Sequence, residues 1–192
     1  MAKAPEPESV KTRLKGHLSD EERVALYERM LKDTVERLRQ VPGTDTFITY
    51  SCTGDGDSSE YFSRFGLPIF PQQGEGLGTR MLLALERVLE MGYSRAALVG
   101  ADIPGLGPRE VVEALGLLDF ADAAFGPAAD GGYYLVACKK PHPEVFMDVE
   151  WSTPDTLMQT LDRAADAGLK TALGPVLEDV DTVDDLRREG LL

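Results

Sequence analysis

The stretch that decides the fold reads RAALVGADIPGLGPREVVEALGLL and covers residues 95–118. It begins with a short apolar run and continues through a loop rich in glycine and proline. Pro108 opens the segment after the loop, at a position where the missing N–H of proline costs a helix nothing. The stretch therefore predicts a buried strand, a loop and a helix over residues 108–118.

The same alternation continues outward in both directions. Strand-like runs cover residues 46–52, 68–72, 121–127 and 133–139, and helical patterns cover residues 19–40, 59–65, 76–92, 152–168 and a short segment after Thr182. Ser19 and Glu22 have capping-box spacing at the start of the longest helix. Ser152 or Thr153 is the expected N-cap of the helix over 152–168, with Pro154 in its first turn. Strands that alternate with helices predict an α/β fold with a mostly parallel sheet flanked by helices.

The chain is acidic, with 33 acidic against 20 basic residues and a formal net charge of −13. This charge repels nucleic-acid phosphates and anionic lipids, so neither nucleic acid nor a membrane is expected as a partner. No apolar run approaches the roughly twenty residues of a membrane span, and the opening residues MAKAPEPESV lack the apolar core of a signal peptide. We expect one globular domain over residues 1–192, located in the cytoplasm.

The cysteines and histidines suggest little reactive chemistry. Cys52 and Cys138 both lie in strand-like runs, which favours buried thiols over a disulfide or redox pair. His17 and His142 lie beside polar or proline-rich segments, without a partner at metal-ligand spacing, so both are expected at the surface. A zinc site or a Ser-His-Asp triad is therefore not expected.

Asp102 directly follows the buried strand of the opening stretch, where ligands bind in sheets of this kind. A carboxylate at this position suits Mg²⁺, which takes one or two carboxylates and leaves its other positions to water and substrate phosphates. An Asx turn or a helix cap ahead of Pro104 explains the same residue equally well. The sequence leaves both interpretations open.

Four basic residues, Lys3, Lys11, Arg13 and Lys15, stand close together near the start of this acidic chain. Arginine binds phosphate oxygens in pairs and lysine acts as a point charge, so such a cluster suits a polyphosphate. The alternative is a solvated basic stretch that pairs with surface acids. Local composition does not separate the two.

The stretch GPAADGGYYL, residues 126–135, fits both a hairpin turn and a reaction site. An Asp-Gly pair between strand-like runs indicates a tight turn, and two glycines beside Asp130 also allow close approach of a ligand. Two carboxylates about 4 Å apart repel by roughly 1 to 4 kcal/mol, so convergence of Asp130 and Asp181 on Asp102 would imply a cation. For Asp181 the alternative is a charge that complements the dipole of the last helix.

A glycine-rich loop, QQGEGLGTR at residues 72–80, precedes the helix over 76–92. Such a loop presents backbone N–H groups to an anion or a base, although it matches neither the P-loop nor a full dinucleotide-binding fingerprint. Trp151 is positioned to cover a ligand ring, but a single tryptophan is more often part of a core.

Six segments taken in order resemble the motifs of a glycosyltransferase-like family of nucleotide-diphospho-sugar transferases: AKAPEPESVKTRL, QGEGLGTRM, LVGADIP, GPAADGGYYL, VEWSTPDTL and DVDTVDDL. The match covers nearly the whole chain. The family includes transferases associated with radical-SAM proteins and is related to 2-phospholactate guanylyltransferase. The resemblance implies the GT-A fold with a divalent metal, Mg²⁺ or Mn²⁺, at the active centre.

The resemblance also implies roles for particular residues. Lys3, Lys11, Thr12 and Arg13 would meet the nucleotide phosphates; Gly76, Leu77, Gly78 and Arg80 would line the nucleotide pocket; Asp102, Asp130 and Asp181 would hold the metal; and Asp130 and Gly131 would face the acceptor. Lys11, Arg13 and Asp130 would be the catalytic residues among them.

The chain departs from the family pattern in two places. Family members carry glycine where this chain has Glu8, so an extra carboxylate stands where phosphates approach. Members also have a full apolar strand before the AKAP segment, of which Met1 and Ala2 are the residues present here.

The sequence thus predicts a Mg²⁺-dependent transferase that acts on a nucleotide-sugar or a nucleoside triphosphate and a small-molecule acceptor. The metal and the basic residues would neutralise charge on the leaving group, without a covalent intermediate. Glycosyl and nucleotidyl transfer both remain open, as do the base, the sugar, the acceptor and the oligomeric state. The alternative is a nucleotide-binding or regulatory module of the same fold that has lost turnover, which Glu8 favours.

Overall fold

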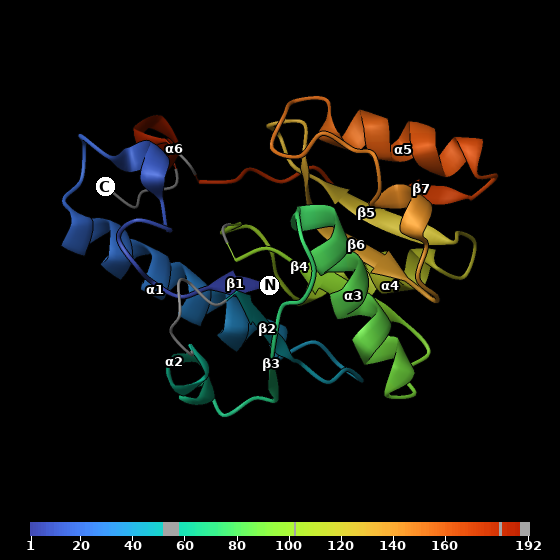
Figure 1. Cartoon of the computed structure of the whole chain (residues 1–192), viewed down its shortest axis with the longest axis horizontal. Coiled ribbons are helices and arrows are strands. Elements are labelled where there is room, and N and C mark those ends of the chain that lie inside the picture. The colour runs from blue at the N-terminus through green and yellow to red at the C-terminus, as the bar shows by residue number, and fades with distance from the viewer. Residues whose placement is uncertain (52–57, 102, 181, 189–192) are drawn as a thin grey trace. The chain divides into compact units, whose positions relative to one another are not determined.

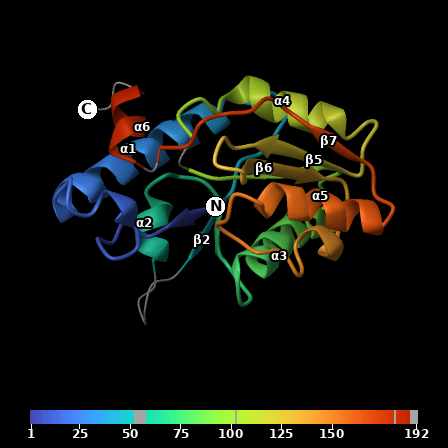
Figure 2. The same cartoon turned by 90° about the horizontal axis from the view of Figure 1, so that it is seen from above.

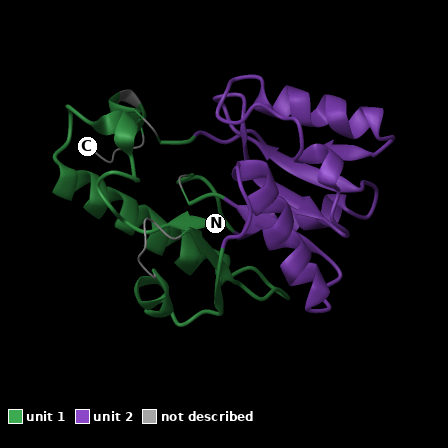
Figure 3. Ribbon diagram, viewed as in Figure 1, with its two compact units in different colours: residues 1–71, 100–107, 179–192 green, residues 72–99, 108–178 purple. Residues whose placement is uncertain are grey.

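The computed structural model describes residues 1–51, 58–101, 103–180 and 182–188, and the chain forms two compact units (Figure 3). Unit 1 comprises residues 1–71, 100–107 and 179–192, and unit 2 comprises residues 72–99 and 108–178. Each unit has its own sheet and its own helices (Figure 1). Among the described residues, none of the helices has the length and apolar character needed to cross a membrane.

Unit 1 is built on a parallel sheet with the strand order β1-β2-β3. Its strands are β1 (Ala2–Lys3), β2 (Ile48–Ser51) and β3 (Ile69–Pro71), and its helices are η1 (Thr12–Leu14), α1 (Asp20–Leu38), α2 (Ser59–Ser63) and α6 (Val183–Arg188). In β1, Ala2 pairs with Tyr50 and Lys3 with Ser51. The AKAP segment therefore begins in a strand.

Helix α1 carries the core of unit 1. The predicted capping box is confirmed, since Ser19 Oγ accepts from Glu22 N at 3.2 Å and Ser19 N donates to Glu22 Oε2 at 2.7 Å. The buried face of α1 enters two hydrophobic clusters. One cluster includes Val10, Tyr27, Leu31, Val35, Ile48 and Phe62, and the other comprises Leu14, Met30, Val180 and Leu186. The helix thereby packs against the start and the end of the chain.

Unit 2 is built on a sheet with the strand order β4-β6-β5-β7. Its strands are β4 (Ala96–Val99), β5 (Ala123–Pro127), β6 (Tyr133–Cys138) and β7 (Thr171–Leu173), and its helices are α3 (Leu77–Glu90), α4 (Pro108–Leu117), η2 (Pro143–Val145) and α5 (Thr156–Asp166). Helix α4 covers one face of this sheet, and α3 and α5 cover the other (Figure 2). The predicted α/β fold is confirmed.

Strand direction follows the prediction in unit 1 and in part of unit 2. Strand β7 is parallel to β5, whereas β6 is antiparallel to both β4 and β5. The cause is the link between β5 and β6, since residues 128–132 form a hairpin that is too short for the crossover a parallel pair requires.

The predicted start of the helix over 152–168 is wrong, because α5 begins at Thr156. Ser152 has a left-handed backbone with φ 63, and Pro154 precedes the helix. The hydroxyls of Thr153 and Thr156 both donate to Glu150 O, at 3.2 and 2.8 Å, and close a turn before the helix starts. Threonine hydroxyls that bond the backbone locally compete with helix formation in this way.

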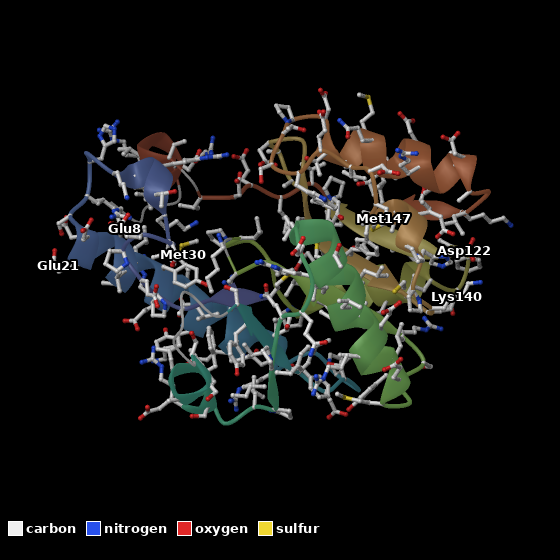
Figure 4. All side chains as sticks on the ribbon, viewed as in Figure 1. Glu8, Glu21, Met30, Asp122, Lys140 and Met147 are labelled. Carbon is white, nitrogen blue, oxygen red and sulfur yellow. The ribbon has the colours of Figure 1, made fainter. Side chains whose placement is uncertain are left out.

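His17 is exposed as expected, but the surface position expected for His142 is wrong, because its exposed fraction is 4%. His142 precedes the short helix η2, in which Val145 is also buried, with an exposed fraction of 1%. Burial lowers the pKa of His142, and the charge of Lys140 lowers it further, while Asp122 opposes the shift. Figure 4 labels Asp122 and Lys140 in this region.

Cys138 is a buried thiol in the middle of the unit 2 sheet. Its residue is 2% exposed and pairs with Ala96 on one side and Ala123 on the other. Burial raises the pKa of this thiol to about 12. The prediction of a buried, unreactive thiol is confirmed for Cys138, whereas Cys52 lies outside the described residues.

In a Cys52→Ser variant, native Cys138 should react with a chromogenic aromatic disulfide at pH 8 at least about 100-fold more slowly than in the unfolded chain. The reason is that the thiolate is the attacking species and burial raises the thiol pKa from 9.0 to about 12. The release of the chromophore measures the rate, and the same variant in guanidinium provides the control. Fast labelling of the folded variant would contradict the burial.

Candidate active site

The N-terminal loop, residues 4–18, carries most of the predicted phosphate-binding cations. Its backbone turns on itself, since Ser9 N and Val10 N both donate to Glu6 O, at 2.9 and 3.1 Å. Val10 and Leu14 are 2% and 0% exposed, and each belongs to a hydrophobic cluster that includes residues of α1. The loop is therefore a packed element with a fixed backbone.

The cations near this loop differ in their surroundings. Lys3, in β1, and Arg13 are exposed, as is Thr12 between Lys11 and Arg13. The Nζ of Lys15 lies 2.8 Å from Glu8 Oε2, with both side chains substantially exposed. Figure 4 labels Glu8 in this region. Lys15 thus pairs with a surface acid, as the alternative interpretation of the basic stretch predicts.

Lys11 is the buried cation of the cluster, with an exposed fraction of 7%. Its Nζ donates to Val180 O at 2.6 Å, which joins the N-terminal loop to the segment before position 181. Its backbone is left-handed, with φ 46 and ψ 41, a conformation that is uncommon outside glycine. Lys11 therefore has a structural contact in addition to its predicted role.

Arg23, in α1, is a residue that the sequence patterns did not single out. It is 0% exposed, and its Nη1 donates to Pro7 O at 2.8 Å and to Val10 O at 2.9 Å. Its Nη2 bonds to the carboxylate of Asp20. In the sequence, the run DEER at the start of a helix suggests a solvated face. The signal for the burial of Arg23 is its spacing from Tyr27, which is buried and lies one turn further along the helix.

Asp130 lies at the tip of the hairpin between β5 and β6. Its Oδ1 accepts from Gly132 N at 2.9 Å, and Gly131 N donates to Ala128 O at 3.1 Å. The hairpin interpretation of GPAADGGYYL is therefore confirmed, with the Asp130 carboxylate closing its own turn. Asp130 is nevertheless exposed, so its side chain is accessible to a ligand.

Gly131 fits a close approach between the hairpin and the start of α5. Its φ is +91°, and a Cβ at this position would lie 1.9 Å from Pro154 O. Gly131 O also accepts from Leu157 N at 3.0 Å. The hairpin tip is thus fixed on the first turn of α5, and the geometry has no room for a side chain.

The glycine-rich loop at residues 72–80 leads into α3, as predicted. Gly76 is the N-cap residue of α3, with φ 76, and the Nε of Arg80 donates to Gly74 O at 3.2 Å. Leu77 is 41% exposed at the first position of the helix. The loop therefore presents backbone and one apolar side chain at the surface of unit 2.

Trp151 packs against the helix that follows this loop. A Cβ at Gly78 would lie 2.2 Å from Phe146 O and 2.8 Å from the Trp151 ring. The Trp151 ring meets the Tyr133 ring edge to face at 6.1 Å between centroids, and Tyr133 meets Phe125 in the same way at 5.2 Å. These contacts support the core interpretation of Trp151.

The predicted site residues fall into two groups. Unit 1 holds Lys3, Lys11, Thr12 and Arg13, and unit 2 holds Gly76, Leu77, Gly78, Arg80, Asp130 and Gly131. Among the predicted metal ligands, Asp102 and Asp181 lie outside the described residues. Within the described ranges, no three His, Cys, Asp or Glu side chains are grouped as a metal site. The metal ligands stay a prediction.

Solved structures define the class of fold. A crystal structure of a proposed nucleotide-diphospho-sugar transferase from Desulfovibrio desulfuricans G20 has a TM-score of 0.88 and 36% identity, and the match covers 96% of this chain and 81% of that one. CMP:2-keto-3-deoxy-manno-octonic acid synthetase complexed with CTP has a TM-score of 0.58 and 17% identity, and the match covers 83% of this chain and 85% of that one. The chain has the nucleotide-diphospho-sugar transferase fold, as its motifs predict.

Residues 34–153 match the model of a family described as uncharacterized protein conserved in bacteria, DUF2064, and the chain belongs to this family. A 2-phospho-L-lactate guanylyltransferase from Methanothermobacter thermautotrophicus strain Delta H is 32% identical over 125 residues. That match covers 64% of this chain and 53% of the relative, so the chain spans about half the length of this curated relative. The names of the two relatives support a transferase enzyme.

A Gly131→Ala variant should lose at least about 2 kcal/mol of unfolding free energy. The new methyl group would overlap Pro154 O, and the backbone has φ +91°. Urea denaturation measures the loss. Gly168→Ala is the matched control, because Gly168 has φ +70° with nothing within 4 Å, so its cost of about 1 kcal/mol comes from the backbone alone. Equal losses in the two variants would contradict the steric constraint at Gly131.

Proposed function

We propose that residues 1–192 act as one Mg²⁺-dependent transferase domain that uses a nucleotide-sugar or a nucleoside triphosphate and a small-molecule acceptor. The observation that carries the proposal is the anchored N-terminal loop, which exposes Arg13 in a chain of net charge −13. A cation on a fixed backbone recognises phosphate with little loss of conformational entropy. Membership in a family with transferase relatives supports the same function.

In this proposal Lys3, Lys11, Thr12 and Arg13 bind the nucleotide phosphates. Arg13 has a planar guanidinium that suits paired phosphate oxygens, and Thr12 adds a hydroxyl donor. Lys11 bonds to Val180 O, but an ammonium has three donors, so this bond is compatible with a phosphate contact. Lys11 and Arg13 would neutralise the charge that builds on the leaving group.

The proposed role of unit 2 is to hold the nucleotide and the acceptor. Gly76, Leu77, Gly78 and Arg80 would line the nucleotide pocket, where a loop at a helix start offers backbone N–H groups. Asp130 and Gly131 would face the acceptor. Asp130 supports this role because its Oδ1 closes the turn, while its Oδ2 makes no hydrogen bond to the part of the chain that the structure describes.

The proposed metal ligands are Asp102, Asp130 and Asp181. Carboxylate oxygens are the ligands that Mg²⁺ and Mn²⁺ prefer, and the carboxylate of the exposed residue Asp130 fits such an ion. When bound, the metal would stabilise negative charge on the phosphate oxygens. The chain's own part is to orient the phosphates through Arg13 and to keep the acceptor beside Asp130.

The two transfer reactions release different products. In nucleotidyl transfer an acceptor oxygen bonds to the α-phosphorus, the bond from this phosphorus to the bridging oxygen breaks, the acceptor proton passes to solvent and pyrophosphate leaves. In glycosyl transfer the acceptor oxygen bonds to the sugar C1, the bond from C1 to the phosphate oxygen breaks, the acceptor proton passes to solvent and a nucleoside diphosphate leaves. An assay for the two products therefore assigns the reaction.

Calorimetry with nucleoside triphosphates and nucleotide-sugars should show binding that strengthens with Mg²⁺ concentration. Asp102→Ala should weaken that binding by at least about tenfold, because a Mg²⁺ ligand is lost. Asp162→Ala is the matched control, since Asp162 is exposed on α5 in unit 2. Binding that responds neither to Mg²⁺ nor to Asp102→Ala would exclude the proposed enzyme.

A nucleotide-binding or regulatory module without turnover is the second candidate function. The observation that favours it is the ion pair between Glu8 and Lys15, at 2.8 Å, which neutralises one cation of the N-terminal loop. Glu8 also places a carboxylate at the position where family members carry glycine. The two candidates predict different responses when Glu8 is replaced.

Glu8→Gly should strengthen nucleotide binding several-fold, roughly the effect of one exposed charge pair of up to about 1 kcal/mol, because Lys15 is released and a repulsive carboxylate is removed. Glu21→Gly is a control for the charge alone, since Glu21 is an exposed acid in the first turn of α1. Turnover that appears only in Glu8→Gly supports the module without turnover, and turnover in the parent chain supports the enzyme.

A further inference from the structure

Burial of the charged Arg23 side chain costs free energy, and the packing of α1 does not need a charged residue at this position. A helix that packs an apolar face against a core gains nothing from a guanidinium there, and charged side chains are rarely fully buried unless they are paired. The exposed fraction of Arg23 is 0%, and its Nε has no hydrogen-bond partner among the described residues. Its ionic partner Asp20 is itself 58% exposed, so the pair is only half enclosed.

The contacts of Arg23 are directed at the backbone of the N-terminal loop. The carbonyls of Pro7 and Val10 both accept from Nη1, at 2.8 and 2.9 Å. These carbonyls lie on either side of Glu8 and Ser9, so a single nitrogen closes the turn. Buried carbonyls need a partner, and Arg23 supplies it here from a helix.

The bond to Val10 O acts directly on the residues proposed to bind phosphate. Val10 O belongs to the peptide group that joins Val10 to Lys11, and fixing its direction limits the backbone of Lys11. Lys11 adopts the left-handed region with φ 46, which non-glycine residues enter only when their surroundings demand it. Thr12 and Arg13 follow in η1, so their direction depends on this peptide.

We propose that Arg23 is a positioning residue that holds the N-terminal loop in its phosphate-binding conformation before the nucleotide arrives. This inference rests on the proposed function of the loop. Arg23 acts through Val10 and Lys11 and does not itself touch the nucleotide. Its guanidinium is the suitable group because a planar fork serves two carbonyls and one carboxylate at once.

Three variants test the role. Arg23→Met removes the charge and the donors while keeping the length of the side chain, and Arg23→Lys keeps the charge but loses the planar fork. Arg29→Met is the matched control, since Arg29 is exposed on the same helix. Each variant is titrated with the Mg²⁺ complexes of GTP, CTP, UTP and ATP, and amide hydrogen exchange is recorded without nucleotide.

For Arg23→Met we expect a rise of about tenfold in the nucleotide Kd, or in KM where turnover is measured, with kcat changed less than about twofold. Amide exchange should become faster over residues 4–15 and stay unchanged in β5, β6 and α5. Arg23→Lys should give a smaller change in both measurements, and Arg29→Met should match the parent chain. If Arg23→Met does not fold, Arg23→Lys decides alone by the same criteria.

Two results would overturn the inference: nucleotide binding that is unchanged in the Arg23 variants, or loss of exchange protection throughout unit 1 in both of them. The second result would mean that Arg23 only stabilises the core. If the parent chain binds neither these four nucleotides nor a nucleotide-sugar, the proposed function fails, and the exchange data separately decide whether Arg23 orders the loop.

Discussion

Unit 1 depends on one stripe of polar side chains along α1 that bind the backbone of other segments. Arg23 bonds to the backbone of Pro7 and Val10, and Tyr27 bonds to the backbone of Lys3. Further along the same stripe, Thr34 bonds to the backbone of Ala101 and Arg37 to that of Pro104. Residues at these spacings share one side of a helix. Because a helix is rigid, the N-terminal loop, β1 and the residues on both sides of position 102 are placed relative to one another by a single element.

Unit 2 places its candidate site by close contact between backbones. The carbonyl oxygen of Phe146 occupies the space that a Cβ at position 78 would need. The carbonyl oxygen of Pro154 occupies the corresponding space at position 131. Glycine at these two positions lets α3 and the β5–β6 hairpin approach the loop over residues 146–154. The two units therefore position their candidate residues by different means, side-chain donors in one and absent side chains in the other.

The sequence predicts features that local chemistry determines. The capping box of α1, the glycine start of α3 and the hairpin at Asp130 all follow from residues within a few positions of each other, and so does the capping of α6 by Thr182, whose Oγ1 accepts from Asp185 N at 3.2 Å. Tertiary contacts decide the rest. The burial of Arg23 and His142 depends on distant segments that no local pattern reveals.

The candidate site could be predicted in part for the same reason. Motif order makes Lys11 and Asp130 candidates, but the partner of Lys11 is Val180, 169 residues away, and the Glu8 side chain pairs with Lys15. A list of cations therefore overstates the positive charge available, since one cation is paired and another is buried. The sequence does not reveal which groups pair with these cations, because only the folded chain determines their partners.

The acidity of the chain gives a physical reason for combining a fixed loop with a metal in the proposed function. A net charge of −13 repels the phosphates of a free nucleotide at long range. Salt screens this repulsion beyond about 8 to 10 Å, so affinity has to come from short contacts that are already in place. A nucleotide that carries Mg²⁺ has less negative charge and meets less repulsion from the whole chain. The metal dependence that we propose would then rest on the electrostatics of the entire protein as well as on the carboxylates proposed to bind the ion.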